Sequence, residues 1–126
     1  MIRNPNIPTV NGLPVPYKMT WQKRDNRRVL CNLPCVLYAV MLDYQGPGDV
    51  YLQIFEGHEN PGNGMTPTLP PIPITPNAFT YFDFTPGIPF VGGVGVAIST
   101  TRDSLTLATD DAIFNAVFYP LDVLAP

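Results

Sequence analysis

Proline is the residue that most constrains the fold of this chain. The 126 residues include 16 prolines and 10 glycines, which lie between short apolar runs. Because proline lacks a backbone donor and clashes with the preceding helical turn, a chain divided in this way leaves no room for long helices. The apolar runs are rich in β-branched and aromatic residues, which are typical of strands. The sequence therefore predicts one all-β domain, and its length is sufficient for a hydrophobic core without metals or disulfides.

The clearest strand pattern lies between residues 79 and 101. We expect two strands there, joined by a turn at Thr85-Pro86-Gly87. Successive side chains of a strand point to opposite faces. In the second strand one face is branched and the other is nearly bare, because Val94, Val96 and Ile98 alternate with Gly95, Ala97 and Ser99. A bare face lets another layer approach closely, so this strand is expected to be central.

Two further strands are expected to form a hairpin before this region. Residues 35 to 44 are apolar on both faces, which indicates a central strand that is covered on both sides. The turn signal Gln45-Gly46-Pro47-Gly48 follows, and residues 49 to 56 return as the second strand. Residues 57 to 71 form a long loop with little apolar content, and such loops are either functional or mobile.

The remaining strands complete the predicted fold. Ile72-Pro73-Ile74 is an edge strand, because proline cannot donate to a central ladder. Residues 105 to 107 are a short strand, and the last strand, residues 112 to 119, turns Ala112, Phe114, Ala116 and Phe118 to one face. Seven or eight short strands at regular spacing predict an antiparallel β-sandwich with a jelly-roll-like arrangement.

The first residues differ from this pattern. Residues 1 to 20 contain four prolines and no sustained period, so we expect an extended arm that is neither strand nor helix. The predicted organisation is an arm over residues 1 to 30, a sandwich over 31 to 120 and a tail over 121 to 126.

Charge is divided unequally between the arm and the body. Residues 1 to 28 carry a net charge of +5 and the rest carries −8. Such a division suggests that the arm docks on an acidic surface of a partner or of a neighbouring copy, although a solvated arm is the alternative. Nucleic acid is an improbable partner, because the body is acidic and no known basic–aromatic motif is present. The candidate docking residues are Trp21, Lys23, Arg24, Arg27 and Arg28.

Catalytic and metal sites are not predicted. The only histidine, His58, lies in a loop rich in glycine and proline, and no serine or cysteine lies in a nucleophile motif. Asp110 and Asp111 are adjacent, so in an extended strand they would point to opposite faces. A calcium site built from Asp49, Glu56 and Glu59 would lack the ligand density of a known motif. We expect no enzymatic activity and no cofactor.

The two cysteines leave one alternative open. On a straight strand Cys31 and Cys35 would lie roughly 13 Å apart, well beyond disulfide reach. Pro34 permits a bend between them, so a disulfide is not excluded. Two buried free thiols in a reducing compartment are the simpler expectation.

Several stretches together carry a resemblance to a known group of proteins. In their order and spacing they are similar to small tailed-bacteriophage virion proteins, in which one β-sandwich domain serves as a capsid decoration (cement) protein or another small structural module. The likeness spans about residues 35 to 119 and leaves the basic arm outside. The stretches are Val36-Leu37-Tyr38-Ala39-Val40, Tyr51-Leu52-Gln53-Ile54-Phe55-Glu56, Pro70-Pro71-Ile72-Pro73-Ile74, Phe82-Asp83-Phe84 with Gly87-Ile88-Pro89-Phe90, Gly95-Val96-Ala97-Ile98-Ser99-Thr100-Thr101, and Asp111-Ala112-Ile113-Phe114 with Val117-Phe118-Tyr119.

The resemblance implies a virion protein of the capsid surface, made in the host cytoplasm. Its expected partner is the major capsid protein, which it would bind as a homotrimer at local threefold positions, with the arms reaching over adjacent capsid subunits to stabilise the head. The absence of a leader pattern and of a long apolar run agrees with an expectation of no membrane partner.

A receptor- or glycan-binding module of a tail fibre or baseplate is the alternative. Its site would lie in the loop of residues 57 to 71, with Tyr44, Tyr51 and Tyr81 as aromatic residues for sugar stacking. These tyrosines would otherwise pack on the sheet surface.

Overall fold

The computed structural model describes residues 9–10, 13–14, 17–20, 23–109 and 112–120. Over these residues the protein is all-β, as predicted, and it contains no helix. The strands are β1 (Thr9–Val10), β2 (Leu13–Pro14), β3 (Tyr17–Thr20), β4 (Arg27–Cys31), β5 (Cys35–Tyr44), β6 (Val50–Glu56), β7 (Ile72–Ile74), β8 (Ala78–Phe90), β9 (Val94–Ser99) and β10 (Ala112–Pro120).

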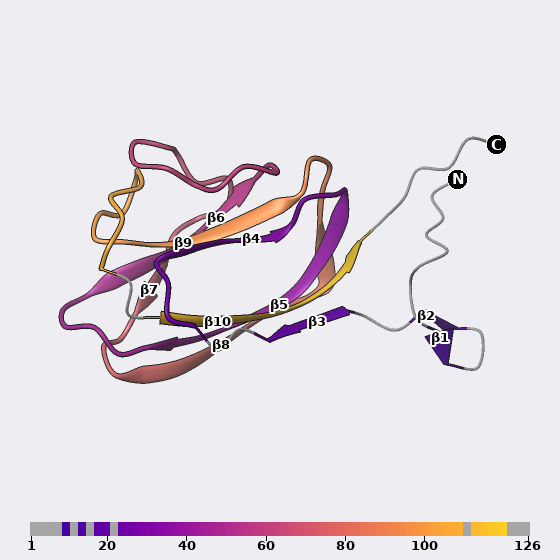
Figure 1. The fold of residues 1–126 in the computed structure, drawn as a ribbon, viewed down its shortest axis with the longest axis horizontal. Coiled ribbons are helices and arrows are strands. Elements are labelled where there is room, and N and C mark those ends of the chain that lie inside the picture. The colour runs from indigo at the N-terminus through magenta and orange to yellow at the C-terminus, as the bar shows by residue number, and fades with distance from the viewer. Residues whose placement is uncertain (1–8, 11–12, 15–16, 21–22, 110–111, 121–126) are drawn as a thin grey trace.

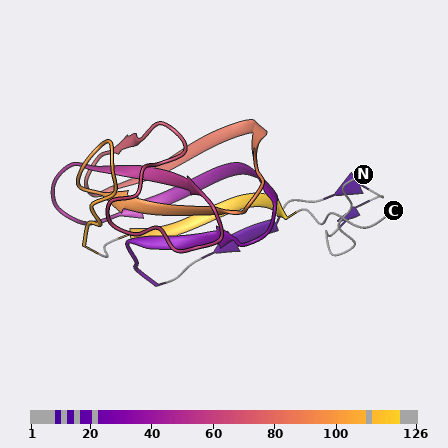
Figure 2. The same ribbon diagram turned by 90° about the horizontal axis from the view of Figure 1, so that it is seen from above.

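Eight of these strands form two antiparallel sheets that face each other as a β-sandwich (Figure 1). One sheet has the order β3-β10-β5-β8 and the other has the order β4-β9-β6-β7. Strands β1 and β2 pair separately with each other. The view from above shows β4 along one side of the sandwich (Figure 2). Strand β8 is an edge strand of the other sheet and runs along the opposite side in the same view.

The strand pairs are nested within one another along the chain. β6 pairs with β7, β5 with β8, β4 with β9, and β3 with β10. Two additional pairings, β10 with β5 and β9 with β6, join these pairs into the two sheets. The arrangement is that of a long hairpin, with its tip at the loop of residues 57 to 71, rolled up into a sandwich.

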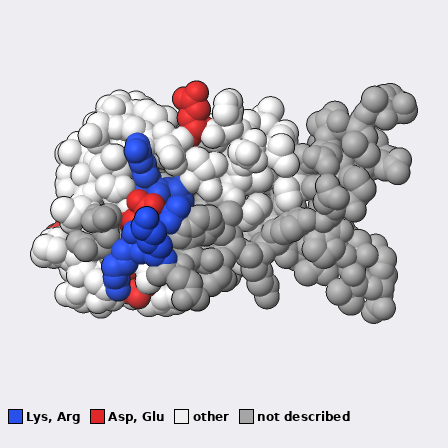
Figure 3. Space-filling view, viewed as in Figure 1, with Lys and Arg blue, Asp and Glu red and all other residues white. Residues whose placement is uncertain are grey.

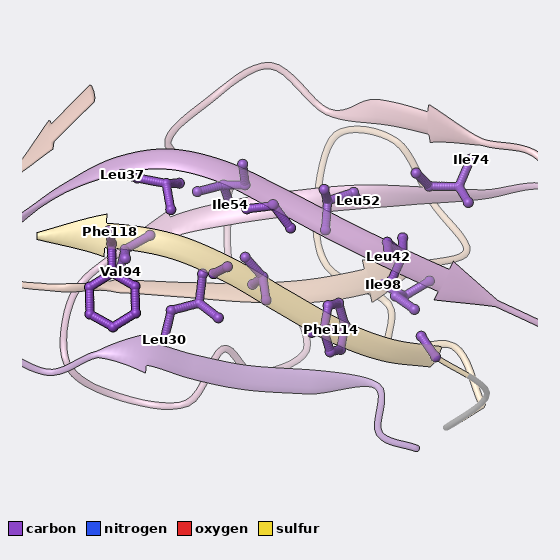
Figure 4. Packing of buried hydrophobic residues seen from close by; sticks show 14 of the residues in the cluster. Leu30, Leu37, Leu42, Leu52, Ile54, Ile74, Val94, Ile98, Phe114 and Phe118 are labelled. Carbon is purple, nitrogen blue, oxygen red and sulfur yellow. The ribbon is translucent and has the colours of Figure 1, made fainter. Parts of the chain in front are cut away.

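The core lies between the two sheets (Figure 4). Leu37 and Leu42 of β5 and Phe114 of β10 come from one sheet, and Ile54 and Ile98 come from the other. All five side chains are 1% exposed or less. Burial of each such side chain contributes about 1.5 to 3 kcal/mol, so this layer is the main source of stability.

The predicted faces of the last strand are confirmed. Along β10 buried residues alternate with half-buried ones, and Ala112, Phe114, Ala116 and Phe118 are the buried set. The expected edge position of Ile72–Ile74 is also confirmed, because β7 is the last strand of its sheet and pairs with β6.

Strand β9 is central and buried on both faces, as its small residues predicted. Its outer face is covered by two loop segments, residues 57 to 71 and residues 100 to 109. Ala97 packs with Phe55 and Leu105 in a second, smaller apolar cluster. A side chain at Gly95 would meet Pro61 at 3.2 Å, which shows how closely the first loop approaches.

Both predicted hairpins are wrong. Strands β5 and β6 have the predicted bounds to within a residue, yet they lie in different sheets, so the turn at residues 45 to 48 carries the chain from one sheet to the other. Strands β8 and β9, the region of the second predicted hairpin, also lie in different sheets. A turn signal specifies a reversal of the chain but not the sheet in which the next strand pairs.

The predicted turn at Thr85-Pro86-Gly87 is also wrong, because β8 continues through it. The extra residues form a bulge: four residues of β8 lie opposite one residue of β5 between the pairs Asp83–Ala39 and Ile88–Leu37. An edge strand tolerates both the bulge and Pro86. Gly87 is required there, because its φ is +115° and a Cβ would lie 2.5 Å from Val36.

Two smaller expectations need correction. Residues 105 to 107 form only a single bridge, between Leu107 and Ser99. The arm is not free of strands, because Tyr17–Thr20 pairs with β10 and Arg27–Cys31 pairs with β9. The sandwich therefore begins before residue 31. These two segments lack an alternating side-chain pattern, but they form strands because the neighbouring strands offer backbone donors and acceptors for hydrogen bonding.

Candidate docking surface

Four basic residues predicted as a docking cluster lie on or just before β4. Lys and Arg side chains gather on the side of the sandwich that faces the viewer in Figure 1, with acidic side chains among them (Figure 3). We call Lys23, Arg24, Arg27 and Arg28 the basic cluster. All four lie within six residues, and the last two are in β4 itself.

The backbone around the basic cluster is fixed to the sandwich. The N–H of Asp25 donates to Ala112 O at 2.8 Å, which ties the segment to β10. The Asn26 side chain donates to Ala108 O at 2.9 Å, and Ile98 N donates to Asn26 O at 2.9 Å. The cluster is therefore presented by a rigid sheet edge, not by an extended arm.

The two arginines of β4 are partly engaged within the protein. Arg27 Nη1 donates to Pro61 O at 2.9 Å, so it also holds the covering loop. Arg28 Nε lies 3.4 Å from Asp25 Oδ2, and these side chains are only 21% and 29% exposed. An ion pair with this exposure contributes about 1 kcal/mol or less. Lys23 and Arg24 are exposed and supply most of the outward-facing charge.

Trp21, the remaining predicted docking residue, lies outside the described residues. Its role as an interface anchor stays a prediction. Truncation of residues 1 to 28 would remove β3 and the start of β4 together with the cluster. Point substitutions therefore isolate the docking role better than a deletion does.

The three tyrosines predicted to stack on a sugar differ in their exposure to solvent. Tyr44 is 1% exposed and its hydroxyl donates to Pro47 O at 3.1 Å, so it is a core residue and not a stacking platform. Tyr51 is half-buried. Tyr81 is 55% exposed, and Phe79, which the sequence reasoning missed, is 65% exposed. The alternation of residues 79 to 83 along β8 carries the signal that places Phe79 and Tyr81 on one face.

An acidic group lies near these aromatic residues on β8. The hydroxyl and the backbone N–H of Thr85 both donate to the Asp83 carboxylate, and these hydrogen bonds lower the pKa of Asp83. The carboxylate is thereby kept ionised, so Asp83 adds one negative charge to the β8 edge.

Metal-binding geometry is absent from the part of the chain that the structure describes. Within it, no three histidine, cysteine, aspartate or glutamate side chains gather closely enough to hold an ion, so Asp49, Glu56 and Glu59 do not form the calcium site considered above. Glu56 Oε2 instead accepts a hydrogen bond from Val91 N at 2.6 Å. His58 is exposed, and Asp110 and Asp111 lie outside the described residues.

Comparison with known proteins adds no family to this description. Among the described residues, no helix is long and apolar enough to cross a membrane. No protein-family model, no curated protein and no solved structure matches the chain.

Proposed function

We propose that this protein is a bacteriophage structural protein of the capsid decoration type, which binds the outer capsid surface and stabilises the head. The observation that carries the docking role in this proposal is the basic cluster. It places cationic side chains on a rigid strand edge of a chain whose residues from 29 onward carry −8. Complementary charge orients and accelerates association more than it adds affinity. The matching partner is an acidic patch of the major capsid protein, and the proposed unit is a homotrimer.

The strand order supports this proposal. Nested pairs of strands that roll up into two four-stranded sheets are the pattern expected of a jelly roll, a fold found in viral capsid and lectin domains. We therefore also propose a jelly-roll topology for the two sheets. Since one fold hosts many functions, the assignment to a virion rests on the resemblance of residues 35 to 119, a region that contains β5 to β9 and β10 without its last residue.

A binding assay on undecorated phage capsids tests the proposal. The protein is added to the capsids, and the mass per particle is measured as the salt concentration rises. We expect saturation at a number of copies that matches symmetry-related sites, and weaker binding at high salt because screening shortens the range of the attraction. A protein that does not bind these capsids at low salt contradicts the proposal.

Two charge-reversal variants distinguish a loss of docking from a loss of folding. Lys23→Glu with Arg24→Glu reverses the two exposed charges and is expected to weaken binding about tenfold or more, since each surface pair contributes up to about 1 kcal/mol. Arg102→Glu is the control, because Arg102 is 62% exposed and pairs only locally with Asp103. Equal binding by both variants would exclude the basic cluster as the docking surface. The melting temperature of each variant shows that it is folded.

Exposed Phe79 and Tyr81 favour one second candidate, a module that binds a receptor glycan. Neighbouring aromatic side chains on an open strand offer flat surfaces for sugar rings, and lectin domains share the proposed fold. A glycan array compares the wild type with Tyr81→Ala. Glycan binding that this substitution abolishes, together with no capsid binding, would favour this second function.

A further inference from the structure

Two cysteines lie at the corner where the chain crosses between the sheets. Cys31 is the last residue of β4 and Cys35 is the first residue of β5, and the two strands belong to different sheets. The bend of residues 32 to 34 that joins them contains Pro34. The separation of roughly 13 Å expected for a straight strand therefore does not apply.

Both thiols are in the main core, and their surroundings differ. Cys35 is 0% exposed and Cys31 is 8% exposed, so Cys31 is the thiol nearer to solvent. Cys31 Sγ also lies 3.5 Å from Leu33 O, inside the bend. Leu33, which lies in the middle of this bend, is 43% exposed, so the bend reaches the surface.

The two thiols also differ in acidity because they interact. A hydrogen bond from Cys35 lowers the pKa of Cys31 to about 7, against the opposing effect of burial. The same hydrogen bond raises the pKa of Cys35, and burial and the charges of Cys31 and Glu56 raise it further. A thiolate is the nucleophile in disulfide exchange, so Cys31 is suited to attack and Cys35 to act second.

We propose that Cys31 and Cys35 form a thiol–disulfide exchange site, at which a small-molecule disulfide of the glutathione class converts the pair into an intrachain disulfide. The sulfur of Cys31 attacks one sulfur of the disulfide RSSR, and the departing RS⁻ takes up a proton. Cys35 then loses its proton, and its sulfur attacks Sγ of Cys31 and releases the second RSH. Two electrons pass from the protein to RSSR, which becomes two RSH.

The bend explains why the mixed disulfide resolves within the protein. A disulfide needs Cα atoms about 4.4 to 6.8 Å apart, and a bend between two residues brings them closer than a straight strand does. Both cysteines flank the same three-residue bend and belong to the same buried core cluster, so the second thiol is held near the first. The resulting bond joins the two sheets at one corner.

Oxidised glutathione and the native full-length protein provide the test. Intact mass and the number of free thiols are followed with time. We expect the wild type to lose the mass of two hydrogen atoms and both free thiols, without lasting gain of glutathione. Reduction should restore the original mass, and the oxidised form should melt at a higher temperature than the reduced form.

Two variants identify the order of the steps. Cys35→Ser should retain glutathione on Cys31, because no second thiol displaces it. Cys31→Ser should stay unmodified while it remains folded, because Cys35 is the buried thiol. Wild-type protein whose thiols stay free in native solution, yet react once urea unfolds it, would overturn the proposal. A stable glutathione adduct on the wild type, or faster reaction of Cys31→Ser than of Cys35→Ser, would overturn it as well.

Discussion

Single polar side chains organise the surface layer of this sandwich. Gln53 of β6 is fully buried, and its amide nitrogen lies 3.0, 2.9 and 3.2 Å from the carbonyl oxygens of Thr101, Arg102 and Ser104. Ser99 Oγ supports the same loop, since it accepts hydrogen bonds from the N–H groups of Thr101 and Thr106 at 3.1 and 3.0 Å. The covering segment of residues 100 to 109 is thus folded around two side chains that project from the sheet.

Gln53→Glu is expected to destabilise the protein by about 3 kcal/mol or more at neutral pH. The substitution replaces a donor with a buried negative charge that faces three carbonyl oxygens. Such a site raises the pKa of the new carboxyl in the folded state. The penalty is therefore small below about pH 4.3, the ordinary value for glutamate, and grows as the pH rises above it.

Urea unfolding of Gln53→Glu at several pH values measures this effect. Asn60→Asp is the control, because Asn60 is exposed and exposed substitutions usually change the unfolding free energy by about 0.5 kcal/mol or less. Equal stability of the two variants at pH 7 would show that the amide of Gln53 does not hold the loop.

Strand β9 contacts the main core with one face and the covering loops with the other. Val94, Val96 and Ile98 belong to the main core, while Ala97 and Gly95 face the covering loops. A Cβ on Gly95 would lie 3.2 Å from both Arg28 O and the ring of Pro61. The small side chains of this face set the distance at which the loops can cover the sheet.

Gly95→Val should lower the unfolding free energy by about 1 to 3 kcal/mol, because two further methyl groups overfill a packed contact. Gly92→Val is the matched control, since its nearest neighbour would be Gly57 Cα at 3.8 Å. Thermal unfolding of both variants gives the comparison. A Gly95→Val protein as stable as the control would mean that the loop moves aside without cost.

Side-chain alternation explains which elements could be predicted from the sequence. The bounds of β5 follow from its continuous apolar run, and the two faces of β9 and β10 follow from the alternation of their side chains. Buried residues alternate with half-buried ones in β10, whereas every residue of β9 is buried. The sheet to which each strand belongs depends on contacts between residues far apart in the chain. No turn signal encodes that choice, so both hairpins were assigned wrongly.

The candidate site was predictable to a similar extent. The run of cations before residue 29 is visible in the sequence, and so is its contrast with the acidic body. Which of these cations face solvent depends on Asp25 and on Pro61, which lies more than 30 residues away. Sequence alone therefore located the cluster but did not separate Lys23 and Arg24 from the arginines that brace β4.

At the scale of the whole molecule, the nested strand pairs place the last described strand, β10, in the interior of a sheet. β10 lies between β3 and β5 and contributes four buried residues to the core. Its pairs join residues 17–20 to residues 115–118, almost the full length of the described chain. Contacts of this range must wait for the intervening strands.

The position of β10 affects how the chain folds during its synthesis on the ribosome. While residues 112 to 120 are still unmade or inside the exit tunnel, β3 and β5 lack the strand that joins them. A chain that ends at residue 111 should be digested rapidly by a protease, whereas a chain that ends at residue 120, which keeps every described strand, should resist. Resistance of the shorter chain would contradict this expectation. Folding of the sandwich is thus completed only after translation of its last strand, and the nascent chain remains exposed until then.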